Sequence, residues 1–476
     1  MSKVISIIRK GVLFTFIDKY GNVLIQIFTT AILARLLSPY EFGLIAVVMV
    51  FITFFGLLTE MGIGPAIVQY EDLDDKDVNS IFNFTFISGV IFALLFYLLG
   101  GYIAKFYNDK IYIEIVHYLA LVVFFSTLSI VPRAILLKQK KFSVLTKISL
   151  EINVFLSFIT IYLAYIGFSY YAILIRAILS SMLIFFGSFF FSKIGWKGSF
   201  KIRALKKICN FSIFQFAFNF INYFSRNLDN LLIGKYLGTQ YLGLYEKAYT
   251  LMILPVNNLT HVLTPVLQTS LVAYQNDRQF VYNTYLKLVK VLALLGIPVS
   301  VIFYFNAYEL IYLFFGEKWL GIVDTFRILS SSIWIQVILS STGSIYQVIN
   351  RTDLLFMAGI LCSLVMVSMI VLGIISGTLE AIAFYLLIAF LVNFIQGYYI
   401  LIVRALKEDI WKFYKVMIKP IIIGLVMIGV LLINPVNSGS IIESFFIKIA
   451  ISLIVYLVCL YVMDEFKFIK KIFKNS

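Results

Sequence analysis

Polar residues with a regular spacing lie in a stretch of the chain that is otherwise apolar, residues 211–233. Four of them recur at i, i+3, i+7 and i+11 and so share one face of a helix: Asn219, Asn222, Arg226 and Asn230. A polar stripe of this length is too costly to face lipid, so we expect it to line a cleft or to pack between helices. The guanidinium of Arg226 suits phosphate oxygens because its fork of donors can bind them in pairs. The alternative is structural, since Asp229 follows at i+3 and could neutralise Arg226.

A second polar face lies in the first apolar stretch, residues 12–34. It consists of Asp18, Lys19, Asn22 and Gln26. At an offset of 200 residues, the last three correspond to Asn219, Asn222 and Arg226. We therefore expect both polar faces to look into one cleft. The alternative for the first two residues is that they lie near the inner surface and extend to the lipid headgroups.

Glu60 is an ionisable residue in the second apolar stretch, and Gly62, Gly64 and Pro65 follow it. A helix interrupted by Gly and Pro can offer backbone carbonyls to an ion. Glu60 and Asp18 are therefore the candidates for ion coupling, with a proton or a sodium ion, although no complete ion site is evident. A structural pairing role for Glu60 is equally open.

The composition excludes most soluble classes. Of the 476 residues, 61% are hydrophobic and 13% are charged, whereas soluble domains are about 45–50% apolar and about 25% charged. A soluble enzyme, a DNA-binding factor and a secreted disulfide scaffold are all excluded. The three cysteines lack metal or redox spacing, and the sequence lacks a Gly-rich phosphate loop. We expect no metal, cofactor or nucleic acid, and an acidic loop rather than a nucleotide-sugar site at Asp72-Leu73-Asp74.

The apolar stretches predict an all-α integral membrane protein with fourteen transmembrane helices. Their approximate limits are 12–34, 42–68, 81–104, 113–137, 148–167, 169–191, 211–233, 243–270, 283–305, 321–349, 354–376, 380–403, 416–434 and 441–463. With the N-terminus inside, most Lys and Arg residues between the spans fall on the inner side. The positive-inside rule therefore predicts that both termini are cytoplasmic.

An internal repeat divides these spans into two sets. Residues 32–44 read ILARLLSPYEFGL, and residues 232–244 read LIGKYLGTQYLGL, so that Gly43 matches Gly243. Six spans separate the copies, and an even number preserves orientation, so the repeat is parallel. We expect two lobes of six helices that enclose a cleft and rock in alternating access. The predicted parts are an N-lobe (1–192), a basic cytoplasmic linker (193–210), a C-lobe (211–404), and two further helices with a basic tail (405–476).

Several strings resemble one family as a set. LARLLSPYEFGL (33–44), MGIGPAIVQ (61–69), the run from Arg226 to Thr260 and FFGEKWLG (314–321) are similar to bacterial polysaccharide flippases of the Wzx type. This type handles O-antigen, colanic-acid or teichuronic-acid units and belongs to the multidrug/oligosaccharidyl-lipid/polysaccharide exporter superfamily. The resemblance covers about residues 1–360, and the remainder fits by span count.

The resemblance implies a transporter and not an enzyme. Its substrate would be a polyprenyl-pyrophosphate-linked oligosaccharide, moved from the inner to the outer leaflet of the bacterial cell membrane. On this interpretation Arg226 and Lys19 meet the pyrophosphate, while neighbouring amides bond sugar hydroxyls. A polymerase and glycosyltransferases of the same pathway would be its partners, together with the membrane lipids.

Three other functions remain open at this point. A small-molecule cation antiporter of the same superfamily would favour an acidic cleft. A membrane polysaccharide polymerase or glycosyltransferase would need a sizeable outer loop with catalytic residues, and every outer loop here is short. A lipid-linked peptidoglycan precursor flippase fits the motifs less well.

Overall fold

The computed structural model describes residues 2–60, 62–70, 73–195, 223, 227–434 and 440–468. These residues form helices joined by short connections and contain no strand. The chain divides into two compact units, Met1–Gly243 and Leu244–Ser476. The all-α class predicted from the apolar stretches is therefore confirmed for the described part of the chain.

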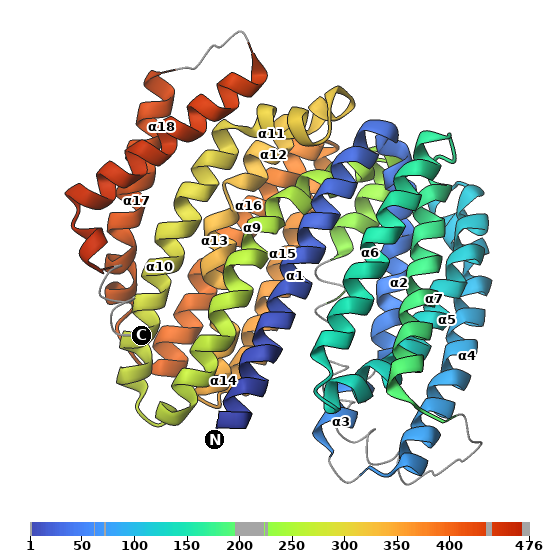
Figure 1. Cartoon of the computed structure of the whole chain (residues 1–476). Helices are drawn as coiled ribbons and strands as arrows, with labels where there is room; N and C mark the ends of the chain where they lie inside the picture. Colours follow the sequence, from blue (N-terminus) through green and yellow to red (C-terminus); the bar gives the residue numbers. More distant parts are fainter. Residues whose placement is uncertain are drawn as a thin grey trace. The chain divides into compact units, whose positions relative to one another are not determined.

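Unit 1 is a helical bundle centred on one helix (Figure 1). Its helices are α1 (Ser2–Leu36), α2 (Pro39–Glu60), α3 (Ile63–Gln69), α4 (Asp75–Tyr107), α5 (Ile111–Lys138), α6 (Phe142–Tyr165) and α7 (Tyr171–Ser192). Residues 227–236 are also helical. Helix α5 packs against α2, α3, α4, α6 and α7, so this apolar helix forms the middle of the bundle while α1 lies along α6.

Local sequence sets the helix ends of unit 1. The side chain of Asp74 accepts a hydrogen bond from the backbone N–H of Asp77, and the side chain of Asp77 accepts one from the backbone of Asp74, which makes a capping box at the start of α4. This explains one aspartate of the predicted acidic loop. Helix α2 stops at Glu60, and Gly62 adopts a left-handed conformation (φ 72°) before α3 begins at Ile63. The interruption expected from Gly62, Gly64 and Pro65 is thus present.

The two matched glycines of the repeat lie against each other within unit 1. Helix α9 (Thr239–Leu271) begins beside the start of α2. A Cβ added to Gly43 would lie 1.8 Å from the carbonyl oxygen of Thr239, and one added to Gly243 would lie 1.9 Å from the carbonyl oxygen of Pro39. Pro39 and Thr239 are themselves separated by the repeat offset of 200 residues. The contact is therefore reciprocal, and only glycine permits this backbone approach.

Unit 2 is a bundle centred on α10 (Figure 1). After the first residues of α9, which belong to unit 1, its elements are the rest of α9, η1 (Val272–Tyr274), α10 (Arg278–Phe305), α11 (Ala307–Phe314), η2 (Glu317–Ile322), α12 (Val323–Ser330), α13 (Ile333–Leu339), α14 (Thr342–Val348), α15 (Thr352–Ser376), α16 (Leu379–Tyr398), η3 (Tyr399–Leu406), α17 (Ile410–Ile433) and α18 (Ile441–Val462). Helix α10 packs against α12, α13, α17 and α18.

The predicted tenth span, residues 321–349, is broken. It consists of short helices, and the segments Glu317–Ser330 and Ile333–Val348 are bent by 46° relative to each other. Serines stand at the interruptions, at 330–332 and again at 340–341. Serine hydroxyls hydrogen-bond nearby backbone carbonyls and so compete with the helical pattern, as the bond from Ser332 Oγ to Leu329 O at 2.6 Å shows.

Ten helices of the described chain are long and apolar enough to cross a membrane, or eleven if the bent pair counts as one span. The protein is therefore a multi-pass membrane protein. The expected first and eighth spans correspond to α1 and α9, helices of 35 and 33 residues that are not among those ten. Most of the expected seventh span, residues 211–222 and 224–226, lies outside the described residues. The predicted total of fourteen is thus not reached on this part of the chain.

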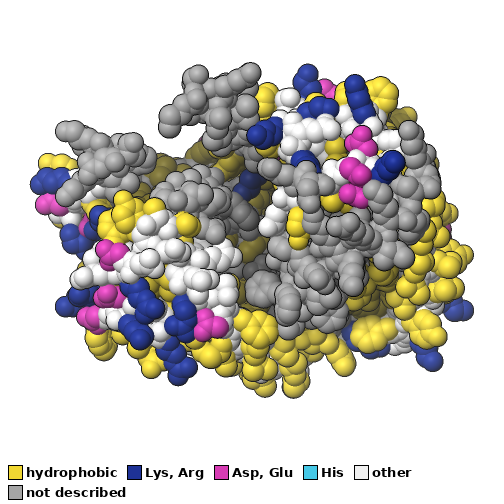
Figure 2. All heavy atoms as spheres, turned by 90° about the horizontal axis from the view of Figure 1, so that it is seen from below, with side chains coloured by type: hydrophobic (Ala, Val, Ile, Leu, Met, Phe, Trp, Pro, Cys, Tyr) yellow, Lys and Arg dark blue, Asp and Glu magenta, His cyan; other side chains and the backbone are white. Residues whose placement is uncertain are grey.

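At the end of unit 1 where α1 begins, Figure 2 shows Lys and Arg side chains, and hydrophobic side chains cover the flank of this unit. In unit 1 this end carries the α3–α4 and α5–α6 connections. The second of these holds Lys140 and Lys141.

Candidate functional site

The predicted polar face of α1 forms a hydrogen-bonded network with α6. The side-chain amide of Asn22 donates to the carboxylate of Asp18 (2.9 Å), to the carbonyl of Asp18 (2.8 Å) and to the hydroxyl of Ser149 (2.9 Å). The side-chain amide of Asn153 donates in turn to the side-chain oxygen of Asn22 (2.8 Å). We call Asp18, Asn22, Ser149 and Asn153 the α1–α6 network. All four side chains are half-buried.

A glycine positions this network. A Cβ on Gly21 would lie 2.8 Å from a methyl carbon of Leu150, so the glycine lets α6 approach the backbone of α1. Ser149 and Asn153 are four residues apart and share one face of α6, as Asp18 and Asn22 do on α1. Thr146, a turn before Ser149, donates to the carbonyl oxygen of Phe14 at 3.1 Å.

The chemistry of the network is that of a carboxylate, two amides and a hydroxyl. Amides and hydroxyls both donate and accept hydrogen bonds, which suits sugar hydroxyls. A carboxylate among neutral oxygens also suits a proton or a hard cation. In the part of the chain that the structure describes, no three His, Cys, Asp or Glu side chains come together to hold a metal ion.

The other predicted residues of α1 lie outside this network. Lys19 is half-buried, and Gln26 is exposed one turn beyond Asn22. Glu60 is exposed at the end of α2, and a Cβ on Gly64 would lie 3.9 Å from its carboxylate. The structure therefore brings Asp18 and Asn22 together, while Lys19, Gln26 and Glu60 take no part in the network.

Most of the second polar stripe lies outside the described residues, namely Asn219, Asn222 and Arg226. Two of its members can be placed. Asp229 is 4% exposed, and its carboxylate accepts the backbone N–H of Asn230 at 2.8 Å. Asn230 is half-buried. The two interpretations of Arg226, as a phosphate ligand or as the ion-pair partner of Asp229, both remain predictions.

Sequence reasoning missed two residues of the network, Ser149 and Asn153. The available signal was their spacing, because two polar side chains one turn apart interrupt an otherwise apolar face of α6. Glu151, which lies between them in the sequence, is exposed.

Unit 2 contains polar groups that the sequence did not single out, and they are deeply buried. The hydroxyl of Tyr398 bonds the hydroxyl of Tyr285 (2.9 Å) and donates to the carbonyl of Ile338 (2.9 Å), and Tyr285 also bonds Ser341 (2.9 Å). These contacts support the second interruption of the broken span. At the first interruption, Ser300 Oγ donates to the carbonyl of Ser330 (2.8 Å) and accepts the backbone N–H of Trp334 (3.2 Å).

A buried ion pair joins α18 to the rest of unit 2 at its N-terminal half. Glu309 of α11 is 4% exposed. Its carboxylate pairs with Lys448 at 2.5 Å and accepts the hydroxyl of Ser444 at 2.9 Å. Lys448 also donates to the carbonyl of Phe305 at 3.3 Å.

A second ion pair lies just beyond the C-terminal end of α18. Glu465 is 1% exposed and pairs with Lys290 of α10 at 2.6 Å and with Lys419 of α17 at 3.3 Å. On the adjacent surface, Lys467 hydrogen-bonds Asp464 and holds the pKa of that carboxyl below its usual value. The two pairs attach α18 to α11, α10 and α17. Single charges in apolar spans were the signal that predicts such pairing.

The arrangement of helices defines a class of membrane protein. The fold is similar to that of the lipid II flippase MurJ, with a TM-score of 0.76 at 17% identity over 95% of this chain and 98% of that chain. It is also similar to a multidrug resistance MATE family transporter in an inward-facing conformation. For that structure the TM-score is 0.65 at 15% identity, over 83% of this chain and 94% of that chain. The molecule therefore has the fold shared by MurJ and MATE transporters.

The sequence places the chain more narrowly. Residues 32–324 match the family model described as "Polysaccharide biosynthesis protein", and the chain belongs to this family. Among its relatives is the teichuronic acid biosynthesis protein TuaB of Bacillus subtilis, which is 26% identical over 89% of both chains. The lipopolysaccharide biosynthesis protein WzxC of Escherichia coli is 23% identical over 79% of this chain and 77% of its own length. The resemblance seen in the motifs is confirmed.

Proposed function

We propose that this protein is a flippase that moves a polyprenyl-pyrophosphate-linked oligosaccharide from the inner to the outer leaflet of the bacterial cytoplasmic membrane. The observation that carries the proposal is the match of nearly the whole chain to the fold of a flippase for a lipid-linked precursor. Membership of a polysaccharide biosynthesis family points to an oligosaccharide on the lipid. A flippase moves its substrate without making or breaking covalent bonds, so no catalytic residue is proposed.

We further propose fourteen transmembrane helices, with lobes at 1–192 and 211–404, alternating access, and both termini in the cytoplasm. The reciprocal contact of Gly43 and Gly243 supports the parallel repeat, because two copies related by a two-fold axis make the same contact twice. The long helices α1 and α9 supply two of the three spans missing from the apolar count. The Lys and Arg side chains at the end of unit 1 where α1 begins support the placement of the N-terminus in the cytoplasm.

For the substrate, we propose that Arg226 and Lys19 meet the pyrophosphate and that the amides bond the sugars. Those amides are Asn219, Asn222, Asn230, Asn22 and Gln26, with Asp229 beside them. The half-buried amide of Asn22 and its partner Asn153 support this role, because they keep polar atoms within reach of a ligand. Asp18 in the network and Glu60 at the helix break are the candidates for coupling to a proton or sodium ion.

The decisive test is a deletion strain. We expect it to accumulate lipid-linked repeat units on the inner side of the membrane, measured as resistance of the labelled glycan to an enzyme added outside spheroplasts. Re-expression of the wild-type chain should make the glycan accessible to the external enzyme again. A strain that exports the glycan normally would exclude the flippase.

The same strain separates the rival functions. If the protein were a cation antiporter, its deletion would change the efflux of a cationic dye and would leave glycan export intact. If the protein were a polymerase, its deletion would leave single repeat units in the outer leaflet. If the protein were a peptidoglycan precursor flippase, its deletion would cause lysis, and an added copy of a known lipid II flippase would relieve it.

Two substitutions test the site. Arg226→Ala should abolish export while membrane abundance stays unchanged, and wild-type flux would exclude Arg226. Asp18→Asn should reduce export and flatten its dependence on the proton or sodium gradient. Glu151→Gln removes an exposed carboxylate from the adjacent helix and is the matched control. If both carboxylate variants behave alike, Asp18 has no special coupling role.

A further inference from the structure

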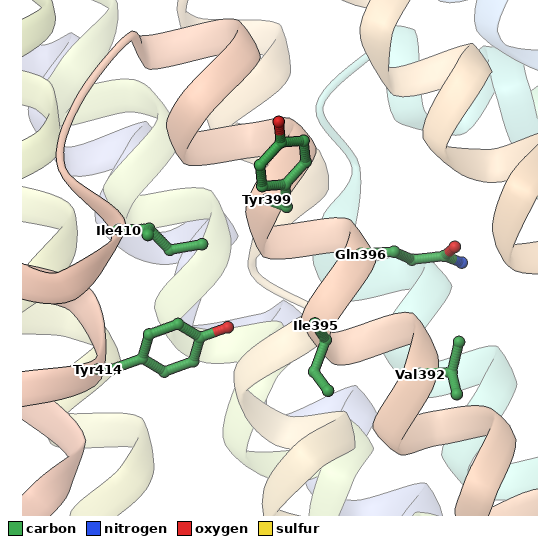
Figure 3. A pocket seen from close by; sticks show the side chains of 6 residues that line it. All are labelled: Val392, Ile395, Gln396, Tyr399, Ile410 and Tyr414. Carbon is green, nitrogen blue, oxygen red and sulfur yellow. The ribbon is translucent and has the colours of Figure 1, made fainter.

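A groove in unit 2 lies between the end of α16 and the start of α17 (Figure 3). Its volume is 310 Å³, and its lining consists of Val392, Ile395, Gln396, Tyr399, Ile410 and Tyr414. Pockets that hold small ligands measure about 300–1,000 Å³. The groove is therefore large enough for part of a single lipid chain.

The surface of the groove is apolar, and the rings of Tyr399 and Tyr414 line it together with Val392, Ile395 and Ile410. Figure 3 shows Tyr414 pointing from α17 toward Ile395, while Tyr399 lies farther along the chain toward the α16–α17 turn. Gln396 points away from Tyr414, and its amide donates to Asn393 at 2.6 Å. The groove thus offers an apolar surface that suits a hydrocarbon chain.

A rare helix type brings a cation to the same end. Residues Tyr399–Leu406 form a π-helix, which pairs residues five apart and is frequent at functional sites. In an α-helix only residues three or four apart are neighbours. Here Arg404 follows Tyr399 by five positions, and its guanidinium lies 6.0 Å from the Tyr399 ring centroid. The π-helix therefore brings an exposed arginine beside Tyr399, which is one of the residues that line the groove.

The surroundings fit a membrane interface. Trp411 is 70% exposed at the start of α17, and exposed tryptophans mark the level of the headgroups. The nearby acid Asp409 is engaged, since its carboxylate accepts the backbone N–H of Trp411 at 2.8 Å. Glu408, the other acid of this turn, is half-buried. Arg404 and Lys407 are exposed.

We propose that this groove binds an anionic phospholipid of the leaflet that adjoins the α16–α17 turn. One acyl chain lies along Val392, Ile395 and Ile410, and the phosphate meets Arg404. Arginine binds phosphate with paired donors, and basic pockets between transmembrane helices are typical sites for anionic headgroups. The site is separate from the α1–α6 network and does not rest on the transported substrate.

Tryptophan quenching tests the proposal on the purified full-length chain in nanodiscs. The probes are brominated phosphatidylglycerol and brominated phosphatidylcholine with identical chains, and Trp411→Phe identifies the signal of Trp411. We expect phosphatidylglycerol to quench Trp411 more strongly at equal mole fraction. One basic residue near a surface contributes about 1 kcal/mol, so Arg404→Gln should weaken the association by about fivefold.

Lys412→Gln is the matched control, because it also removes one exposed positive charge but from a residue outside the groove lining. Ile395→Phe, which fills the groove, should weaken quenching without changing charge. Equal quenching by both lipids, or equal effects of Arg404→Gln and Lys412→Gln, would overturn the proposal. Displacement of phosphatidylglycerol by undecaprenyl phosphate, at concentrations where phosphatidylcholine has no effect, would assign the groove to a polyprenyl chain and also overturn it.

Discussion

The polar side chains of the two units have different surroundings. In unit 1 the α1–α6 network joins half-buried groups that water or a ligand can still reach. In unit 2 the hydroxyls of Tyr285 and Tyr398 are fully buried, and Glu309 is 4% exposed. A half-buried amide can exchange one partner for another, whereas a buried group is held by the cost of leaving it unpaired. The comparison separates the half-buried groups that we propose for transport from the buried groups that hold the fold.

The fourth and tenth predicted spans, which the proposed repeat makes equivalent, differ in the same sense. Helix α5 of unit 1 is continuous from Ile111 to Lys138 despite Pro132, while the span 200 residues later is broken and supported by Ser300 and Tyr285 of α10. Broken helices are tolerated at membrane depth only where protein or a cavity satisfies the freed backbone groups. Unit 2 does so with side chains of its central helix.

The largest effect is expected where the matched glycines meet. Gly43→Leu places a side chain where even a Cβ lies 1.8 Å from a backbone oxygen, so α2 and α9 must separate. We expect a loss of more than about 4 kcal/mol, seen as absence of folded protein after detergent extraction. Gly56→Leu on the same helix is the control, because its Cβ meets nothing within 4 Å. Normal folding of the Gly43 variant would contradict the close contact.

The next largest effect concerns the buried pair of Glu309 and Lys448. Lys448→Met leaves the carboxylate buried without its cation, which costs about 3–5 kcal/mol. This cost is measured as the change in the free energy of unfolding when the purified protein is titrated with SDS. The double variant with Glu309→Leu should recover most of the loss. Lys467→Met, which removes an exposed partner of Asp464, should leave the free energy of unfolding near the wild-type value, and an equal loss in both single variants would refute the distinction.

A smaller effect is expected at the broken span. Ser300→Ala leaves the carbonyl of Ser330 and the N–H of Trp334 without the hydroxyl that bonds both, which costs about 1–3 kcal/mol. Ser368→Ala on the exposed face of α15 is the control. The same SDS titration compares the stabilities of the two variants. If they are indistinguishable, the interruption of the span does not depend on α10.

The smallest effect on stability, with the largest effect on transport, is expected in the α1–α6 network. Asn22→Leu and Asn153→Leu each remove hydrogen bonds between half-buried groups, and such bonds between membrane helices average about 0.6 kcal/mol. Glycan export should fall severely in both variants while stability stays near that of the wild type. Loss of stability and transport in parallel would place this network with the structural groups of unit 2.

Much of the fold was predictable because membrane depth imposes length and polarity on each segment. The break after Glu60 followed from Gly62 and Pro65, and the motifs at 33–44 identified the family. The polar character of 321–349 was visible, but not its interruptions. Of the α1–α6 network, Asp18 and Asn22 were named from the polar face of the first apolar stretch, and their role in a site stays a prediction. Asn153 was missed because its role depends on which helix lies beside α1.

The sequence by itself determined the membrane class, the family, the basic face and the matched pair of glycines. These depend on composition, periodicity and repetition, which act along the chain. Only the tertiary structure decided that Gly43 meets Gly243, that Lys448 neutralises Glu309 and that a π-helix brings Arg404 beside the ring of Tyr399. Those contacts depend on how helices distant in sequence pack, and a single polar residue in an apolar span does not specify its partner.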